Sequence, residues 1–228
     1  MNKNYIVSFS LFGNDPKYYI GAIKNTLLIK QLLPSWETWI FYHPEMTQMD
    51  KVIELNSIGA ITKDIREYNY PNPESFPYFW RFFAFLEDTS VISRDLDSRI
   101  SNREILYINN WLNSEKDYFI IRDHPWHAPV PSGLFGIKKK IEKFKNYLFN
   151  FIDTQSLVWG ADQEILRLYM QDENILSNDI FYCGYDIRDN YIPRDNKNFF
   201  IGMQMDEHDN PTDPSGYQCL NYINEINL

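Results

Sequence analysis

The stretch Val91-Ile92-Ser93-Arg94-Asp95-Leu96-Asp97 decides the fold predicted for this chain. Four residues that read as a short central strand are followed at once by two carboxylates, one residue apart. In open α/β sheets the ligand lies outside the carboxyl ends of the strands, so both carboxylates would face it. Hard divalent cations prefer oxygen ligands, and two such groups can share one ion. The tripeptide also occurs by chance in solvated turns, so the flanking sequence must show whether it is a metal-binding motif or a turn.

Upstream of this stretch, short apolar runs alternate with helical patterns. Strands are predicted at Tyr5–Leu11, Trp36–Tyr42 and 60–65, and amphipathic helices at 17–33 and 49–58. Asp15 suits the N-cap of the first helix, and Pro16 suits its first turn. Because strands and helices alternate, the connections should be right-handed crossovers in a parallel sheet. This order predicts an α/β fold whose residues 1–100 form a nucleotide-binding half.

The remaining segments are less regular. Pro77–Leu86 is apolar nearly all round, which predicts a buried helix, and Ser101 with Glu104 forms a capping box that opens another. A strand is predicted at 118–121 and a functional loop at 122–136. Helices are predicted at 138–152 and 160–170. The tail from Asn190 is expected to be mostly loop, with one strand at 199–205.

Bulk properties exclude several classes of protein. The 228 residues fit one domain, 1–228, and the formal net charge of −9 makes a nucleic-acid partner unfavourable. Cys183 and Cys219 form no C-x-x-C pair, which excludes a zinc knuckle, and free thiols are expected. The apolar run near the N-terminus is too short for a signal peptide or a membrane span. We therefore expect a cytoplasmic protein with no transmembrane segment.

Five stretches in this order resemble the fold-type-A glycosyltransferases, and in particular a group of small glycosyltransferase-like proteins. They are Tyr19-Ile20-Gly21-Ala22-Ile23-Lys24-Asn25, Phe79-Trp80-Arg81-Phe82, Arg94-Asp95-Leu96-Asp97-Ser98-Arg99, Ile121-Arg122-Asp123-His124-Pro125 and Trp159-Gly160-Ala161-Asp162-Gln163. The resemblance implies a single domain with a mixed, mostly parallel central sheet flanked by helices, in which residues 101–228 form the acceptor side and the tail. It also implies Mn²⁺ or Mg²⁺, a nucleotide-sugar donor, in the first place a UDP-sugar, and a sugar, glycan or protein acceptor.

The same resemblance implies a set of metal-binding residues. Asp95 and Asp97 would hold the metal, with Asp95 also serving the donor, and Asp97 is the stronger candidate for direct ligation. His208 is the candidate for a late histidine ligand, although it could equally be a surface residue of an acidic loop.

Donor contacts are expected from Gly13, Asn14, Arg81 and Arg94. A charge on a helix as apolar as Pro77–Leu86 must be paired, so Arg81 should contact either the donor diphosphate or one of the aspartates. Gly13 and Asn14 follow the first strand, where the nucleotide would lie, but their sequence is also that of a simple turn.

On the acceptor side, His124, Trp126 and Gln163 are the candidate contacts. Pro125 excludes the helical H-E-x-x-H type of metal site, and Trp126 could stack on a sugar ring. Asp123 or Asp162 would be the general base of an inverting transfer, in which a carboxylate takes the proton of the acceptor hydroxyl. Alternatively, Asp162 simply favours the N-terminus of its helix.

Two other functions are open from the sequence. A haloacid-dehalogenase-type phosphatase also places an Asp-x-Asp motif at a strand end, but on the first strand of its core, whereas about three strand–helix units come first here. A glycosyltransferase-like protein that binds the donor without turnover is the second. Activity on a phosphomonoester would support the former, and donor binding without hydrolysis the latter.

Overall fold

The strand that leads to Asp95 lies in the middle of a single sheet. The computed structural model describes residues 5–69, 76–154, 159–175, 177–185, 190–194 and 199–212. Within these ranges, seven strands pair in the order β3-β2-β1-β4-β6-β5-β7. They are β1 (Tyr5–Leu11), β2 (Trp36–Tyr42), β3 (Ile61–Asp64), β4 (Val91–Arg94), β5 (Tyr118–Arg122), β6 (Leu134–Ile137) and β7 (Ile180–Gly184). Only β6 among them runs against the others, so the described sheet is mixed but mostly parallel.

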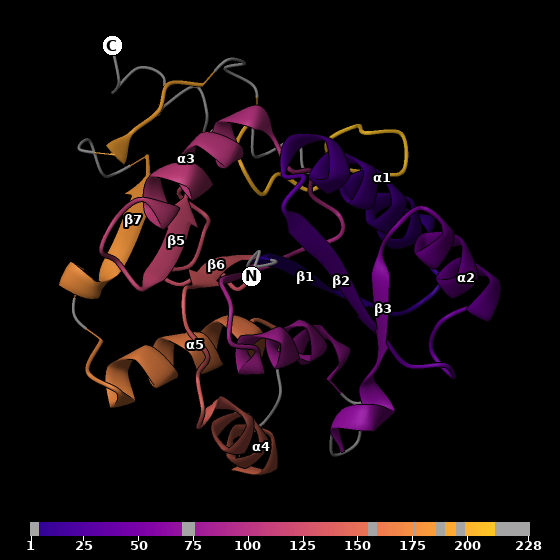
Figure 1. Cartoon of the computed structure of the whole chain (residues 1–228), viewed down its shortest axis with the longest axis horizontal. Coiled ribbons are helices and arrows are strands. Elements are labelled where there is room, and N and C mark those ends of the chain that lie inside the picture. The colour runs from indigo at the N-terminus through magenta and orange to yellow at the C-terminus, as the bar shows by residue number, and fades with distance from the viewer. Residues whose placement is uncertain are drawn as a thin grey trace.

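Helices cover both faces of this sheet (Figure 1). One face carries α1 (Pro16–Leu32), α2 (Met49–Ser57) and α3 (Asn102–Leu112), and the other carries η2 (Pro77–Leu86), α4 (Phe144–Thr154) and α5 (Ala161–Asp172). Two short 3₁₀ turns, η1 (Ile65–Tyr68) and η3 (Ser177–Asp179), join these elements. The buried apolar residues form one large cluster under each helical layer. This is the arrangement that parallel strands require, because both of their faces must be covered.

Local signals account for the helix starts predicted from the sequence. The side chain of Asp15 accepts a hydrogen bond from the Lys17 amide at 3.0 Å, and Pro16 follows it in the first turn of α1. Ser101 accepts one from the Glu104 amide at 3.3 Å at the start of α3. These groups satisfy amides that have no partner within the helix. The order of elements predicted for the first hundred residues is confirmed.

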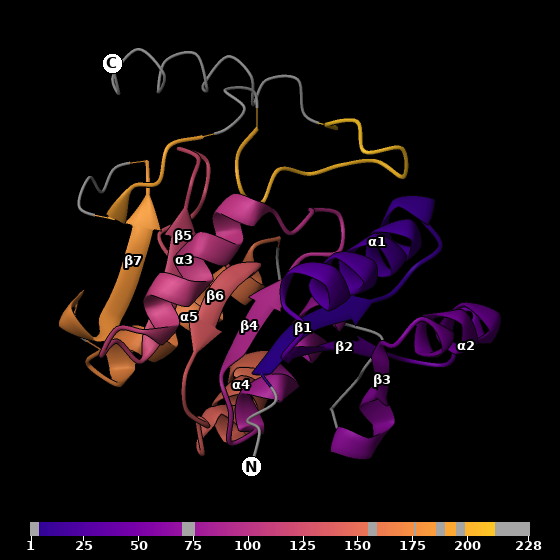
Figure 2. The same ribbon diagram turned by 45° about the horizontal axis from the view of Figure 1, so that its top comes forward.

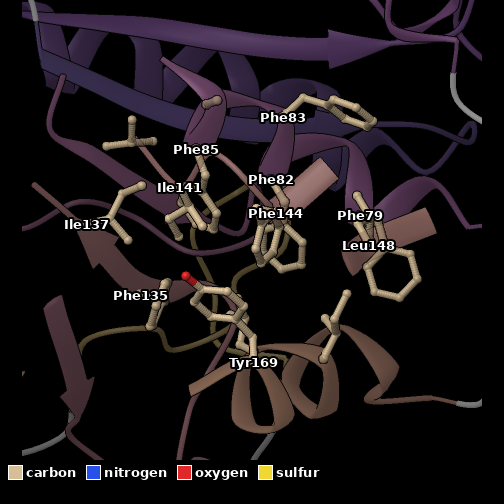
Figure 3. Close-up of a cluster of buried hydrophobic side chains, with 14 of the residues drawn as sticks. Phe79, Phe82, Phe83, Phe85, Phe135, Ile137, Ile141, Phe144, Leu148 and Tyr169 are labelled. Carbon is tan, nitrogen blue, oxygen red and sulfur yellow. The ribbon is translucent and has the colours of Figure 1, made fainter. Parts of the chain in front are cut away.

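The aromatic-rich segment η2 forms the centre of one core. It is a 3₁₀ helix, buried along almost its whole length as its apolar sequence predicts. Figure 3 shows its phenylalanines meeting residues of α4 and α5. The rings of Phe82 and Phe85 stack with centroids 5.4 Å apart, and Phe144 meets Phe82 edge-on at 5.9 Å. Much of the high aromatic content is therefore used for packing, where such pairs add to the free energy of burial.

Three sequence-based assignments in the second half are wrong, and one strand was not predicted. Residues 134–137 form β6, although a loop was predicted as far as 136, and the helix expected from 138 begins only at Phe144. The strand β7 has no counterpart in the prediction, and 199–205 contains only one isolated bridge, between Met205 and Pro211, among the described residues. β6 is short and interrupted by Gly136, where a Cβ atom would lie 3.1 Å from the Val91 carbonyl oxygen. Such a strand has no alternating pattern to reveal it.

None of the helices in the described ranges is long and apolar enough to cross a membrane. Cys183 is a free, buried thiol whose pKa is raised by burial, and Cys219 lies outside the described residues.

Candidate active site

The loop after β4 is held mainly through its backbone. Leu96 is buried, and its carbonyl packs so closely on Gly21 of α1 that no side chain could replace that glycine. The amide of Asn25 donates to the Ser98 carbonyl at 2.8 Å, and the Met205 amide donates to the Asp97 carbonyl at 2.6 Å. These contacts therefore hold the loop by its backbone atoms and do not use the carboxylates on either side of Leu96.

Asp95 and Asp97 line one cavity of about 280 Å³. Its walls come from the end of β1, from η2, from the loop after β4, from Ser132 before β6 and from the start of α5. Figure 2 shows β4 between β1 and β6 in the middle of the sheet. The lining residues are Ser10, Phe12, Tyr18, Tyr78, Arg81, Asp95, Leu96, Asp97, Ser132, Trp159, Gly160, Asp162, Gln163 and Gln204. The cavity therefore lies at the carboxyl edge, where the sequence places the ligand.

Arg81 connects the carboxylates of this cavity. Its buried guanidinium forms ion pairs with Asp95 and, at 2.7 Å, with Asp162. It also donates to the Ser132 hydroxyl at 3.0 Å. A hydrogen bond links its backbone to β1, because the Arg81 amide donates to Ser10 Oγ at 2.9 Å. Arg81 is thus paired with the aspartates, which is the structural alternative predicted from its apolar helix, while it also lines the cavity.

The two carboxylates of the Asp-x-Asp motif have opposite electrostatic environments. Desolvation opposes ionisation of Asp95, but the adjacent Arg81 holds the pKa of its carboxyl below the usual value, and half of its side chain stays accessible. Burial, followed by the negative charge of Asp95, raises the pKa of the Asp97 carboxyl to about 6. Lys17, whose Nζ lies 3.6 Å from Asp97, offsets this only in part. Asp97 is therefore the carboxylate whose negative charge is less fully offset by neighbouring cations.

Asp162 lies in the first turn of α5. Its Oδ2 accepts the Ser132 hydroxyl at 2.6 Å as well as Arg81, and its Oδ1 faces the Gln163 amide at 3.1 Å. Gly160, just before the helix, has φ of +85°, a conformation that other residues rarely adopt. This turn places Asp162 and Gln163 on the cavity wall.

Aromatic rings line part of the cavity. Phe12 and Tyr18 stack with centroids 6.1 Å apart, and Tyr78 lines the wall beside them. Trp159 is 95% exposed although it also lines the cavity. A large apolar ring that is left in water beside a polar cavity suits stacking on a planar or ring-shaped ligand.

Three predicted donor contacts lie elsewhere or face away. Gly13 and Asn14 line a separate hollow beside the start of α1. The Arg94 side chain is 1% exposed and pairs with Glu104 at 3.0 Å, and it also donates to the Gly133 carbonyl at 2.9 Å. It therefore links β4 to α3 and to the turn before β6, rather than lining the cavity.

The predicted acceptor loop is also placed differently. Asp123 is fully buried and accepts hydrogen bonds from Arg103, Arg194 and the Ile201 amide, which leaves its carboxylate no access to an acceptor. His124 is fully buried and stacks on Phe200 at 4.3 Å. Trp126 is half exposed but does not line the cavity. Of the two candidate bases, only Asp162 reaches the cavity.

His208 is an exposed loop residue. Its Nε2 lies 3.8 Å from Glu207, and the loop is anchored because Asp209 pairs with Lys24 at 2.7 Å and with Arg99 at 2.8 Å. In the described part of the chain, no group of three or more His, Cys, Asp and Glu side chains is arranged to hold a metal ion. The structure therefore does not bring His208 to Asp95 and Asp97.

Several cavity residues have no distinctive sequence signal. Ser132 lies in a Pro-Ser-Gly turn, Gln204 in the tail and Tyr18 on the first helix, where each looks like an ordinary polar or amphipathic position, and so does Lys17, which pairs with Asp97. They belong to segments that lie far apart in the sequence, and only the folded structure brings them close to one another.

Comparisons with known proteins address the fold. Neither a protein-family model nor a curated protein matches the sequence significantly. Solved structures of glucosyl-3-phosphoglycerate synthase from Mycobacterium tuberculosis do match. One is 14% identical, covers 84% of this chain and 74% of its own, and has a TM-score of 0.50. Another, solved in complex with phosphoglyceric acid, is 11% identical. It covers 80% of this chain and 70% of its own, with a TM-score of 0.50. A third, solved with Mn²⁺, UDP and phosphoglyceric acid, is 12% identical. It covers 80% of this chain and 68% of its own, with a TM-score of 0.51.

At these identities the likeness shows the fold alone. The chain has a GT-A-like fold with a mixed, mostly parallel sheet flanked by helices, which confirms the fold class predicted from the sequence.

Proposed function

We propose that this chain is a metal-dependent glycosyltransferase that moves a sugar from a nucleotide-diphosphate donor to a hydroxyl group of an acceptor. The observation that carries the proposal is the single cavity shared by Asp95, Asp97, Arg81 and Asp162 at the carboxyl edge of β1 and β4. That edge is where open α/β sheets bind their ligands. The likeness in fold to a synthase solved with Mn²⁺ and UDP supports a UDP-sugar as the first donor to test.

The residues present fit a hard divalent cation, Mn²⁺ or Mg²⁺. Asp95 and Asp97 offer carboxylate oxygens on one cavity, and half of the Asp95 side chain is accessible. Because no third acidic or histidine side chain of the described chain is arranged with these two around one ion, further oxygens would come from the donor diphosphate and water, as is common for Mg²⁺. When bound, such an ion neutralises negative charge that builds on a leaving diphosphate.

Asp162 is the proposed general base if the transfer inverts the anomeric carbon. The acceptor oxygen would form a bond to that carbon while the bond to the diphosphate breaks, and the hydroxyl proton would pass to Asp162. Arg81 and Ser132 hold one oxygen of this carboxylate, at 2.7 and 2.6 Å, and so fix its orientation. A base must be positioned within hydrogen-bond reach of the proton it takes, and this pair of contacts provides that positioning.

The sugar-binding part of the cavity is proposed to include Trp159 and Gln163. Trp159 offers an exposed ring for stacking, and Gln163 offers an amide for a sugar hydroxyl at the start of α5. In this proposal Trp159 takes the stacking role that the sequence suggested for Trp126.

A thermal-shift and calorimetric screen of UDP-sugars, with and without Mn²⁺, tests the proposal, because a ligand that binds only the folded state raises the melting temperature. We expect a shift that needs both UDP and Mn²⁺ and that is lost in Asp97→Asn. Exposed Asp50→Asn on α2 is the matched control and should behave as the wild type. Unchanged binding in Asp97→Asn would refute the metal role. Binding without any release of UDP from the donor would instead indicate a binding protein.

A further inference from the structure

A second cavity, of about 360 Å³, lies between α1 and the start of α3. Leu28 and Leu32 of α1 form part of its apolar wall, Ser101, Asn102 and Arg103 open α3 beside it, and Arg194 completes it. The first cavity and this one share no lining residue. Whatever occupies it is therefore a different ligand, or a different part of one, from the occupant of the Asp95 cavity.

The charges around this second cavity do not balance. The side chains of Arg103 and Arg194 are 7% and 3% exposed, and both pair with the fully buried carboxylate of Asp123. Among the described residues, two buried positive charges thus meet one negative charge. An excess charge removed from water is costly unless an opposite charge approaches it.

Arg194 also has unused hydrogen-bond donors. Its Nη2 serves Asp123, whereas Nε and Nη1 are buried without a hydrogen-bond partner in the described structure. In contrast, each nitrogen of Arg103 that carries a proton donates, to Asp123, the Ile192 carbonyl or the Tyr107 hydroxyl. Buried donors are rarely left unpaired in proteins, so the free positions of Arg194 point to a missing acceptor.

The adjoining helix end favours the same kind of group. Ser101 already caps the Glu104 amide, while the first amides of an α-helix have no partner within it. α3 has 11 residues, long enough for its N-terminus to carry a partial positive charge. A helix N-terminus beside an arginine with free donors is a favourable place for an oxyanion.

We propose that the second cavity binds a phosphate group, held between the Arg194 guanidinium and the N-terminus of α3. Phosphate supplies several acceptor oxygens for the free donors and the negative charge that the Arg103–Asp123–Arg194 cluster lacks. The apolar wall from Leu28 and Leu32 leaves room for an organic part of a phosphate monoester. This inference does not depend on the glycosyltransferase proposal, because it uses none of the residues of the first cavity.

The test is calorimetric titration with inorganic phosphate in the absence of divalent cations, at constant ionic strength, with phenyl phosphate in a parallel arm. We expect saturable binding to one site, and Arg194→Met should weaken it at least tenfold. This variant keeps a balanced Arg103–Asp123 pair and should fold. Arg66→Met, at an exposed arginine of η1, is the matched control and should bind as the wild type. Tighter binding of phenyl phosphate than of phosphate would identify a monoester as the occupant, and equal binding a free phosphate.

Two further variants keep the proposal testable. Gln31→Glu adds a carboxylate at the exposed rim without touching Arg194 and should also weaken phosphate binding. Asp97→Asn, in the first cavity, should leave it unchanged. Wild-type binding by Arg194→Met, or loss of phosphate binding in Asp97→Asn, would overturn the assignment.

Discussion

A side chain on Gly133 would occupy the place of the Asp95 carboxylate. The two residues meet because β6 runs against β4, with Leu134 opposite Arg94, so the start of β6 lies beside the end of β4. The first carboxylate of the Asp-x-Asp motif is therefore positioned by a glycine 38 residues further along the chain (133 − 95 = 38). This relationship makes Gly133 a residue of the site although it offers no functional group.

Gly133→Ala should impair Mn²⁺-dependent UDP binding about tenfold or more while the chain stays folded, because the Asp95 side chain can rotate away and lose Arg81 as its partner. Calorimetry measures the affinity, and circular dichroism checks the fold. The double variant with Asp95→Asn should bind no worse than Asp95→Asn alone, since both changes act on one carboxylate. Additive losses would contradict this explanation.

Asp97→Asn should stabilise the metal-free protein at pH 8. Asp97 keeps its proton up to about pH 6 when folded, but loses it near pH 4 in the unfolded chain. The wild-type free energy of unfolding therefore falls as pH rises through this window, by about 2–3 kcal/mol. Urea denaturation in a chelator should show the variant more stable at pH 8 and the difference shrinking by pH 4.5. An equal difference in stability at both pH values would contradict a raised pKa of the Asp97 carboxyl group.

Arg81→Met should destabilise the chain by about 3 kcal/mol or more, because it leaves the carboxylates of Asp95 and Asp162 without their shared cation. Arg81 is 4% exposed, so water cannot take its place easily. Arg66→Met removes an exposed arginine from a local pair with Asp64 and should cause no measurable change in the same urea titration. Similar losses in the two variants would show that Arg81 has no special role.

Trp159→Phe should abolish the change in tryptophan fluorescence that a bound UDP-sugar causes, whereas Trp126→Phe should preserve it. Both rings are exposed, at 95% and 53%, but only Trp159 of the two lines the cavity. Neither substitution should alter the melting temperature, since little apolar surface is buried at these positions. A signal that depends on Trp126 instead would restore the stacking role predicted from the sequence.

The sequence predicts the parts of the fold that depend on local pattern. Apolar runs and caps locate β1, α1, β2, α2 and β4, because burial and capping leave a periodic signal in neighbouring residues. The same pattern places Asp95 and Asp97 at a strand end. The apolar pattern does not reveal β6 and β7, because short strands inside an irregular region show no alternation of apolar and polar residues.

Local pattern does not predict which charged residues are buried in ion pairs and which line the cavity. Asp123 and Asp162 are both single aspartates beside a strand or helix, yet one is buried against Arg103 and Arg194 and the other lines the cavity.

By itself, then, the sequence determined the α/β fold and the position of the two neighbouring carboxylates, because local periodicity records which side of each element is buried. Only the tertiary structure decided that Arg81, Ser132 and Asp162 join them, and that Arg194 is left with unused donors beside α3. Partners of buried charges come from segments far apart in the chain, and long-range packing, rather than local pattern, brings them within hydrogen-bond distance.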